Sequence, residues 1–315
     1  MVPQDPVEPS MADLLFVSAD GVVMKDLTGL GPWVRANASL QGMLFQGMAG
    51  NAAFVAEPPT LGDLTRLMRA CQQGGHSLRV LGEANNVLVG ANQIPGVVLR
   101  LTAQPFREIT VKDNTVRAGG GASVDSVVSA ACKAGLSGLE TLIGIPGSVG
   151  GALRLNAHDE AGDIGDHIRR VDVVTGDGQV ITRERDELKF ESQGNNLDDA
   201  VIAVAEFELE PEPEDAILRL MKRAWMKRKV HQPLRFGAMG PVFQEPSGLN
   251  AGELITKAGL LRHRVGCAEV SHRDGNYLLV RSPANADDIL RLLELIQQRV
   301  RERFHVDLER KIAVW

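Results

Sequence analysis

Short apolar runs and one amphipathic segment alternate over residues 50–101. An apolar run that ends at Pro58 predicts a strand, and apolar residues at helical spacing over 61–75 predict a helix. Two more apolar runs follow at 76–82 and 94–101, separated by a stretch of small and amide residues. The pattern therefore predicts a strand, a helix, a strand, a loop and a strand. The loop would lie at the carboxyl edge of a sheet, where phosphate-binding loops often lie.

The middle of the chain has the alternation that is typical of antiparallel strands. Residues 106–118 and 168–185 each hold two runs of strand-forming residues around a tight turn, which predicts two hairpins. A further strand is predicted at 200–213. Apolar residues at helical spacing over 122–136 predict a helix with Ser123 as its N-cap. This region is therefore expected to be rich in antiparallel strands, with few helices.

The last third changes to a helical pattern. Apolar spacing predicts helices at 214–233, 247–260 and 282–304, with one strand at 276–281 before the last helix. Two short apolar runs within 13–37 suit a hairpin near the N-terminus. Neighbouring strands followed by a run of helices predict an α+β fold.

Composition places the chain among ordinary globular proteins, with 315 residues, 44% hydrophobic and 23% charged. A net charge of −6 and only 4% aromatic residues argue against a nucleic-acid partner, so the basic run at 222–229 is interpreted as a solvated helix face. The chain lacks a long apolar run and residues 1–16 lack a signal-peptide pattern, so we expect a cytoplasmic protein with no membrane partner. Cys71, Cys132 and Cys267 lack metal or redox spacing, so no metal site is predicted.

Residues 138–157, GLETLIGIPGSVGGALRLNA, are the most unusual stretch. Its glycines recur at spacings that suit the interior of neither a helix nor a strand, and successive N–H groups without side chains over them can form an anion site. Two more glycine-rich stretches lie at 117–121 and 81–90. An anion-binding loop is therefore one interpretation of residues 138–157. A pair of tight turns between strands is the other.

These stretches resemble the motifs of a known family. GLETLIGIPGSVGGALRLNA, LGEANNVLV, VFQEPSGLNAGELITKAGL, AEVSHRDGNYLLV and DLERKIAVW occur in the order of the motifs of the UDP-N-acetylenolpyruvoylglucosamine reductases (UDP-N-acetylmuramate dehydrogenases, MurB). The resemblance covers residues 40–315. It implies a two-subdomain FAD-binding module of the vanillyl-alcohol-oxidase type, followed by an α/β substrate domain. The implied domains are an N-terminal extension over 1–39, FAD-binding subdomains over 40–104 and 105–213, and a substrate domain over 214–315.

The resemblance also implies cofactors and a substrate. FAD would be recharged by NADPH and would reduce the enolpyruvyl ether of UDP-GlcNAc, a nucleotide sugar of peptidoglycan synthesis. The flavin pyrophosphate would lie between two loops of this chain. The implied cofactor-binding residues are Gly82, Ala84, Asn85, Asn86, Val87, Gly120, Gly144, Ile145, Pro146, Gly147, Ser148, Gly150, Gly151 and Asn156.

The catalytic groups implied by the family are replaced in this chain. The serine that donates a proton falls on Pro241, the arginine on Gln193 and the glutamate on Lys311. Because a proton donor commonly contributes about 10²–10⁴-fold, these changes together argue that the standard reaction is lost or weakened. The candidates for a substitute role are Ser192, Glu245, Ser247, Lys311 and the pair His158 and Asp159, whose other interpretation is a polar loop at a strand end.

Three hypotheses follow from these replacements. The protein retains the reductase reaction with substituted residues, or it keeps FAD and acts by binding, or it has lost the flavin as well. Glu83 places a negative charge in the loop where the resemblance puts a pyrophosphate, which weakens that loop. The intact GIPGSVGG sequence favours FAD binding.

Overall fold

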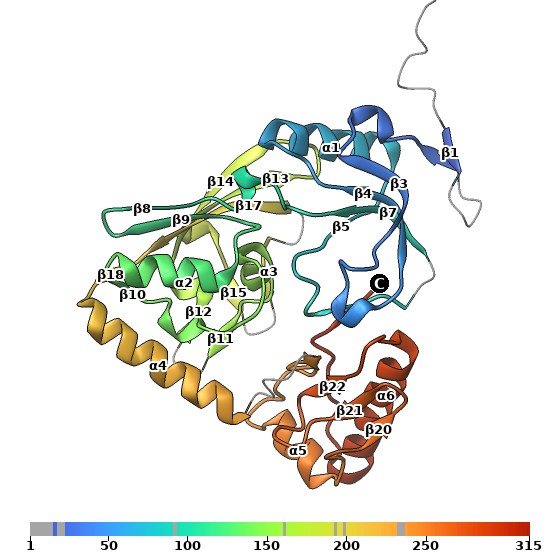
Figure 1. Ribbon diagram of the computed structural model, residues 1–315, viewed down its shortest axis with the longest axis vertical. Helices are drawn as coiled ribbons and strands as arrows, with labels where there is room; N and C mark the ends of the chain where they lie inside the picture. Colours follow the sequence, from blue (N-terminus) through green and yellow to red (C-terminus); the bar gives the residue numbers. More distant parts are fainter. Residues whose placement is uncertain are drawn as a thin grey trace, which may run out of the picture.

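The computed structural model describes residues 15–17, 23–90, 93–159, 162–191, 194–197, 200–231 and 237–315. Figure 1 shows three layered regions, each built around a small sheet. The α-helices are α1 (Leu61–Gly74), α2 (Val124–Lys133), α3 (Val149–Arg154), α4 (Glu214–His231), α5 (Ala251–Lys257) and α6 (Ala286–Phe304). The short 3₁₀ helices are η1 (Thr28–Leu30), η2 (Phe45–Gly47), η3 (Gln104–Phe106), η4 (Glu140–Leu142), η5 (Ile164–His167) and η6 (Arg185–Glu187).

The first sheet has the strand order β3 (Val34–Ser39), β4 (Asn51–Ala56), β7 (Gln93–Leu99), β5 (Leu78–Val80). Strands β4 and β5 run parallel to β7, as the predicted strand–helix–strand unit requires. Strand β3 pairs antiparallel with β4 although it lies in the range assigned to the N-terminal extension, so the first sheet begins before the predicted start at residue 40. The domain boundaries themselves stay a prediction.

Helix α1 shows how local sequence sets the fold of this sheet. The Thr60 hydroxyl accepts the Asp63 N–H at its N-terminus, a cap typically worth about 1 kcal/mol. Gly75 ends the helix in the left-handed conformation that glycine favours, with φ 69°. Leu64 and Leu67 are fully buried on the face that α1 turns to the sheet. The helix therefore covers one face of the first sheet, as Figure 1 shows.

The second sheet is antiparallel, with the order β14 (Val180–Glu184), β13 (Ile168–Thr175), β17 (Ala200–Glu208), β9 (Thr115–Gly119), β8 (Ile109–Lys112). Both predicted hairpins, β8–β9 and β13–β14, are confirmed. Ser123 caps α2 as predicted, because its hydroxyl accepts the Ser126 N–H. Helices α2 and α3 pack with this sheet in a second hydrophobic core.

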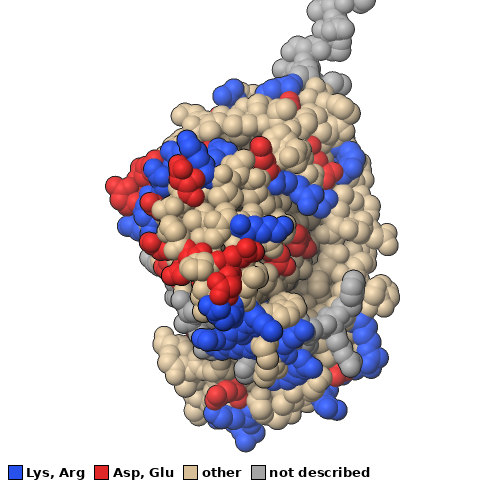
Figure 2. All heavy atoms as spheres, turned by 60° about the vertical axis from the view of Figure 1, so that its left-hand side comes forward, with Lys and Arg blue, Asp and Glu red and all other residues tan. Residues whose placement is uncertain are grey.

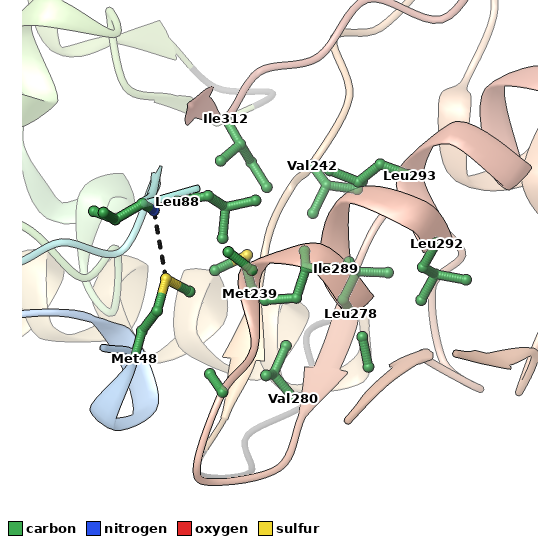
Figure 3. Close-up of a cluster of buried hydrophobic side chains, with 14 of the residues drawn as sticks. Met48, Leu88, Met239, Val242, Leu278, Val280, Ile289, Leu292, Leu293 and Ile312 are labelled. Atoms are coloured by element: carbon green, nitrogen blue, oxygen red, sulfur yellow. Dashed lines mark hydrogen bonds between the residues drawn. The ribbon is translucent and has the colours of Figure 1, made fainter. Parts of the chain in front are cut away.

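The third sheet belongs to the C-terminal region, with the order β19 (Ala238–Met239), β22 (Leu278–Val280), β21 (Ala268–Val270), β20 (Arg264–Val265). Its core is shared with the first region, because Met48 and Leu88 belong to the same buried cluster as Met239 and Ile289. Figure 3 shows this cluster, in which the Met48 sulfur accepts the Val89 N–H at 3.4 Å. The C-terminal region is therefore joined to the first sheet by apolar packing.

The remaining strands form short pairs. These are β1 (Leu15–Val17) with β2 (Val23–Lys25), β10 (Leu136–Ser137) with β18 (Glu210–Pro211), β11 (His158–Asp159) with β12 (Gly162–Asp163), β15 (Phe190–Glu191) with β16 (Gly194–Asn195), and β6 (Val87–Leu88) with β23 (Ala313–Val314). The first pair confirms the predicted N-terminal hairpin. The last pair is parallel and brings the end of the chain against the loop that follows β5.

Helix α4 links the second region to the C-terminal region. Its inward side buries Ile217 and Arg228, and the Arg228 guanidinium donates to the Thr141 carbonyl at 2.9 Å. The cations at 222, 223, 227 and 229 are exposed, and Lys and Arg side chains gather across the lower half of the face in Figure 2, where α4 comes forward. No helix in the described ranges has the length and apolarity that a membrane crossing requires.

Candidate cofactor and active site

A cavity of about 260 Å³ lies where the first sheet meets the second sheet and α3. Glycines and small residues form much of its wall, and the side chains of three arginines reach it. The glycine and serine positions in the wall are Gly82, Gly120, Gly121, Ser148, Gly150 and Gly151. Five of these six were implied as cofactor-binding residues, and all three glycine-rich stretches meet here.

The glycines in this wall allow close approach of backbone segments. A Cβ on Gly120 would lie 2.1 Å from the Ile202 carbonyl oxygen, and one on Gly121 would lie 1.9 Å from that of Leu101. A Cβ on Gly82 would lie 2.7 Å from the Ser148 hydroxyl. Side chains at these positions would therefore push the walls apart or fill the cavity.

The expectation that residues 138–157 form a loop of unused N–H groups needs correction. Helix α3 contains Gly150 and Gly151, and Ser148 is its N-cap, accepting the Gly151 N–H at 3.3 Å. The Gly150 N–H donates to the Gly120 carbonyl at 2.8 Å, and the Gly144 N–H donates to the Asp125 carboxylate at 2.7 Å. These amides already have protein acceptors, so glycine here serves close packing at least as much as anion binding.

The positive charge at the cavity comes instead from Arg100, Arg107 and Arg154. Arg100 is oriented by Glu57, whose carboxylate lies 3.1 Å from its guanidinium, and Arg154 donates to the Ala200 carbonyl at 2.8 Å. Glu83 also lines the cavity. Because Arg100 is already paired with Glu57, the positive charge of the wall comes mainly from Arg107 and Arg154, and it offsets the repulsion that Glu83 was expected to exert on a bound anion.

The sequence did not single out these arginines. Arg100, just after β7, and Arg107, before β8, lie seven residues apart, whereas Arg154 is in α3, and only the fold brings it to the same wall. The one feature of the sequence that could have indicated a site here is a charged residue directly after a buried strand, as Arg100 is.

The other implied cofactor residues continue the two loops away from the cavity wall. Ala84 is buried with φ 56°, a conformation that glycine adopts more easily, and Asn85, Asn86 and Val87 lead into β6. Gly144, Ile145, Pro146 and Gly147 precede α3, and Gly144 lies beneath Trp225, because a Cβ there would be 2.5 Å from that ring. Asn156 is 1% exposed after α3, and its amide donates to Asp163 at 2.8 Å.

Lys311 lies where the C-terminal segment passes between the other regions. Its N–H donates to the Val242 carbonyl at 2.9 Å, and its own carbonyl accepts the Asn86 side-chain amide at 2.7 Å. Burial lowers the pKa of the Lys311 ammonium, while the nearby carboxylates of Glu245 and Asp163 act to raise it. The side chain is half-buried beside residues from two other regions.

Pro241 is half-buried next to a tightly held segment. Asn276 is 2% exposed, and its side-chain oxygen accepts the Val242 and Phe243 N–H groups at 3.2 and 2.8 Å. Its amide nitrogen donates to the Phe243 carbonyl at 3.0 Å and to Glu245 at 3.2 Å. Asn276 therefore fixes the segment after Pro241, and sequence reasoning gave it no role.

Two of the remaining candidates lie in or just after this segment. The Glu245 carboxylate accepts the N–H of Ala251, the first residue of α5, at 2.6 Å, and Ser247 is exposed. The Nδ1 atom of His158 lies 3.1 Å from the Asn156 carbonyl oxygen. Ser192 and Gln193 lie outside the described residues.

The cavity fits a cofactor with a diphosphate. Its glycine walls leave room that a Cβ would fill, and its arginines supply the charge that a pyrophosphate requires. The family model described as "FAD binding domain" matches residues 52–183, which contain most of this wall. The fold and the cavity therefore define a flavoprotein with an FAD-binding module followed by a separate C-terminal domain.

The C-terminal region identifies the family. Residues 232–315 match the family model described as "UDP-N-acetylenolpyruvoylglucosamine reductase, C-terminal domain". The chain is 34% identical over 291 residues to the UDP-N-acetylenolpyruvoylglucosamine reductase of Lactobacillus delbrueckii subsp. bulgaricus, covering 92% of this chain and 97% of that protein. It is 34% identical over 270 residues to UDP-N-acetylenolpyruvoylglucosamine reductase 2 of Symbiobacterium thermophilum, covering 85% and 87%.

A solved structure agrees with the sequence relatives. The crystal structure of UDP-N-acetylenolpyruvylglucosamine reductase (MurB) from Thermus caldophilus superimposes with a TM-score of 0.77 at 32% identity, covering 90% of this chain and 99% of that one. The chain belongs to the UDP-N-acetylenolpyruvoylglucosamine reductase family. The family and the α+β architecture expected from the sequence are both confirmed.

Proposed function

We propose that the protein reduces the enolpyruvyl ether of UDP-GlcNAc to UDP-N-acetylmuramate, with FAD as bound cofactor and NADPH as reductant. The observation that carries the proposal is the glycine-walled cavity with Arg100, Arg107 and Arg154 on its wall. A protein that had lost its flavin would have no need to keep three cations and a void of this size together. The names of the relatives at 34% identity supply the substrate class.

When bound, FAD supplies a hydride to the double bond of the substrate. The chain's own residues hold the reactants. The three arginines bind the cofactor diphosphate, and Asn276 holds the segment at 242–243 in one conformation. The protein must also supply a proton, and Pro241 has no proton to transfer.

A second candidate function is binding of the nucleotide sugar without reduction. Pro241 favours it, because a reductase that has lost its donor would still retain the surfaces that bind cofactor and substrate. The two candidates predict the same flavin content and the same affinity for the substrate. They differ only in whether the substrate accepts electrons from the reduced cofactor.

Two separate half-reactions test the proposal. The purified protein is first mixed anaerobically with NADPH, and bleaching of the flavin absorbance reports the reduction of FAD. The reduced protein is then mixed with UDP-GlcNAc enolpyruvate, and recovery of the absorbance reports transfer to the substrate. We expect both steps. Bleaching without recovery, together with tight substrate binding, would contradict the reductase and support the binding protein. A preparation that neither contains nor takes up FAD would contradict both.

A further inference from the structure

Lys311 is held by its main chain at the meeting point of three regions. Its carbonyl accepts from Asn86, in the loop after β5, and its N–H donates to Val242 in the C-terminal region. The carboxylate of Asp163, which is hydrogen-bonded to Asn156 just after α3, acts on the Lys311 ammonium from the second region. Both hydrogen bonds use main-chain atoms of Lys311, so the backbone fixes where the side chain starts. Within the described residues, the Lys311 amine makes no hydrogen bond or ion pair.

Arg310 and Glu309, which precede Lys311 in the chain, have different surroundings from Lys311. The Arg310 guanidinium is directed to α6, where it lies 3.1 Å from the Gln297 oxygen and 3.7 Å from Glu294. Glu309 is exposed, and its carbonyl accepts the Gln244 N–H at 2.9 Å. Residues 310 and 311 therefore face different surroundings, as neighbours in an extended segment do.

The electrostatic surroundings of Lys311 are those of a group that can exchange a proton. Burial disfavours the ammonium and lowers its pKa, and the carboxylates of Glu245 and Asp163 oppose this by favouring it. A lysine whose pKa lies below its ordinary value, about 10.4, releases a proton more readily and regains it from water near neutral pH.

The other polar groups near Pro241 are committed to structural bonds. Both oxygens of Glu245 accept hydrogen bonds, one from the Ala251 N–H and one from Asn276. All the polar atoms of the Asn276 side chain bond within the 242–245 segment. Lys311 carries a transferable proton, and in the part of the chain that the structure describes its amine has no hydrogen-bond or ion-pair partner.

We propose that Lys311 donates the proton that completes the reduction, in place of a residue at position 241. The inference rests on the proposed function. A hydride adds to the terminal CH₂ carbon of the enolpyruvyl group, and the π electron pair moves to the carbon that bears the carboxylate. A C–H bond then forms at that carbon as an N–H bond of the Lys311 ammonium breaks. The neutral amine regains a proton from water, and NADPH supplies the two electrons.

The test uses the full-length holoenzyme with Lys311→Met, and Lys311→Gln as a second variant in case the first folds poorly. FAD content, melting temperature and the rate of flavin bleaching by NADPH should stay within about twofold of the parent, because the two hydrogen bonds of Lys311 are main-chain bonds. Reoxidation by the enolpyruvyl substrate should fall by about 10²–10⁴-fold. Lys257→Met, at an exposed lysine paired with Glu253 on α5, is the matched control and should change neither step.

Two further measurements separate proton donation from charge alone. Lys311→Arg keeps the positive charge but does not release a proton near neutral pH, so it should lose substrate reduction about as fully as Lys311→Met. The pH profile of reoxidation should fall as pH rises through the pKa of Lys311, and this limb should disappear in the variants.

The outcomes distinguish the two proposals. A parent enzyme that bleaches with NADPH but is not reoxidised overturns the proposed function itself. A parent that turns over, with Lys311→Met equally active or Lys311→Arg fully active, overturns the role of Lys311 as donor and leaves the reductase in place. Loss of flavin bleaching in Lys311→Met would also overturn it, because the effect would then lie in cofactor binding.

Discussion

The side-chain amide of Asn86 donates a 2.7 Å hydrogen bond to the carbonyl of Lys311, which lies 225 residues further along the chain. The same segment continues into β23, where the Ala313 N–H donates to the Asn86 carbonyl at 3.0 Å. The loop after β5 is therefore fixed in part by the C-terminal region. The loop that contains Asn86 and the segment that carries Lys311 belong to one hydrogen-bonded unit.

Replacing Asn86 by alanine should loosen this unit. The Lys311 carbonyl would lose a partner in a half-buried setting, so the free energy of unfolding should fall by about 1–2 kcal/mol. Asn86→Asp should cost at least as much, because it sets a carboxylate against a carbonyl oxygen. Urea denaturation of Asn114→Ala, at the exposed β8–β9 turn, gives the comparison. If Asn86→Ala and Asn114→Ala lowered the free energy of unfolding equally, the hydrogen bond from Asn86 to Lys311 would have no role in stability.

Gly82→Ala should weaken FAD binding. The new Cβ would lie 2.7 Å from the Ser148 hydroxyl, and moving that hydroxyl breaks the cap on α3, which is worth about 1 kcal/mol. FAD affinity should fall by roughly fivefold to tenfold in a fluorescence titration of the apoprotein. Gly176→Ala, where an added Cβ meets open space, should bind FAD normally. Because both changes act through the same hydroxyl, Gly82→Ala and Ser148→Ala should be less than additive when combined.

Removing a positive or a negative charge from the cavity wall should change FAD affinity in opposite directions. Arg107→Met should lower FAD affinity by about threefold to tenfold, and Glu83→Gln should raise it, because a bound diphosphate attracts the first group and repels the second. Both effects should shrink as salt is added, since Arg107 and Glu83 are exposed. Arg66→Met on α1, paired with Asp63 away from the cavity, is the control. A titration in which Arg66→Met and Arg107→Met behave alike would exclude a diphosphate at this wall.

The three cysteines should differ in reactivity. Burial raises the pKa of Cys71 to about 12, and burial followed by the charges of Glu214 and Glu140 raises that of Cys132. Cys267 is only half-buried. A thiol reagent at pH 8 should therefore label Cys267 first in the native protein and all three cysteines after denaturation. Rapid labelling of Cys71 in the native protein would show that α1 opens readily.

Stability should also depend on pH through Cys71. Its pKa is higher in the folded than in the unfolded protein, so its contribution is complete below the ordinary value of 9.0 and is lost as pH rises toward 12. The loss should approach about 1.4 kcal/mol per pH unit above pH 9. Cys71→Ala should remove this slope in denaturation curves measured between pH 8 and pH 10.5. If the slope of stability against pH were the same in Cys71→Ala, groups other than Cys71 would be its cause.

The sequence could predict the structural elements that neighbouring residues determine, such as helix caps and hairpin turns. Ser123 caps α2 where the sequence predicts a helix start, and the hairpins turn where strand patterns break. Helix α3 was missed because Gly150 and Gly151 are poor helix formers. Their place in the helix is set by packing against Gly120, a contact that cannot be read from spacing.

The candidate site was predictable where its residues lie in contiguous motifs. Gly82, Gly120, Ser148, Gly150 and Gly151, which the resemblance implies as cofactor-binding residues, all line the cavity, and their role in binding stays a prediction. The arginines at 100, 107 and 154 and the bonds of Asn276 were not predictable, because each depends on long-range folding that brings distant segments together.

The pairing of β6 with β23 has a consequence for biosynthesis. On the ribosome the loop after β5 emerges long before its partner strand, since Lys311 follows Asn86 by 225 residues. Until the C-terminal region is made, β6 is an open edge and Asn86 has no carbonyl to bind. The loop after β5 therefore reaches its final conformation only after translation has passed Lys311, so we expect chains that stop before β23 to keep this loop unfixed.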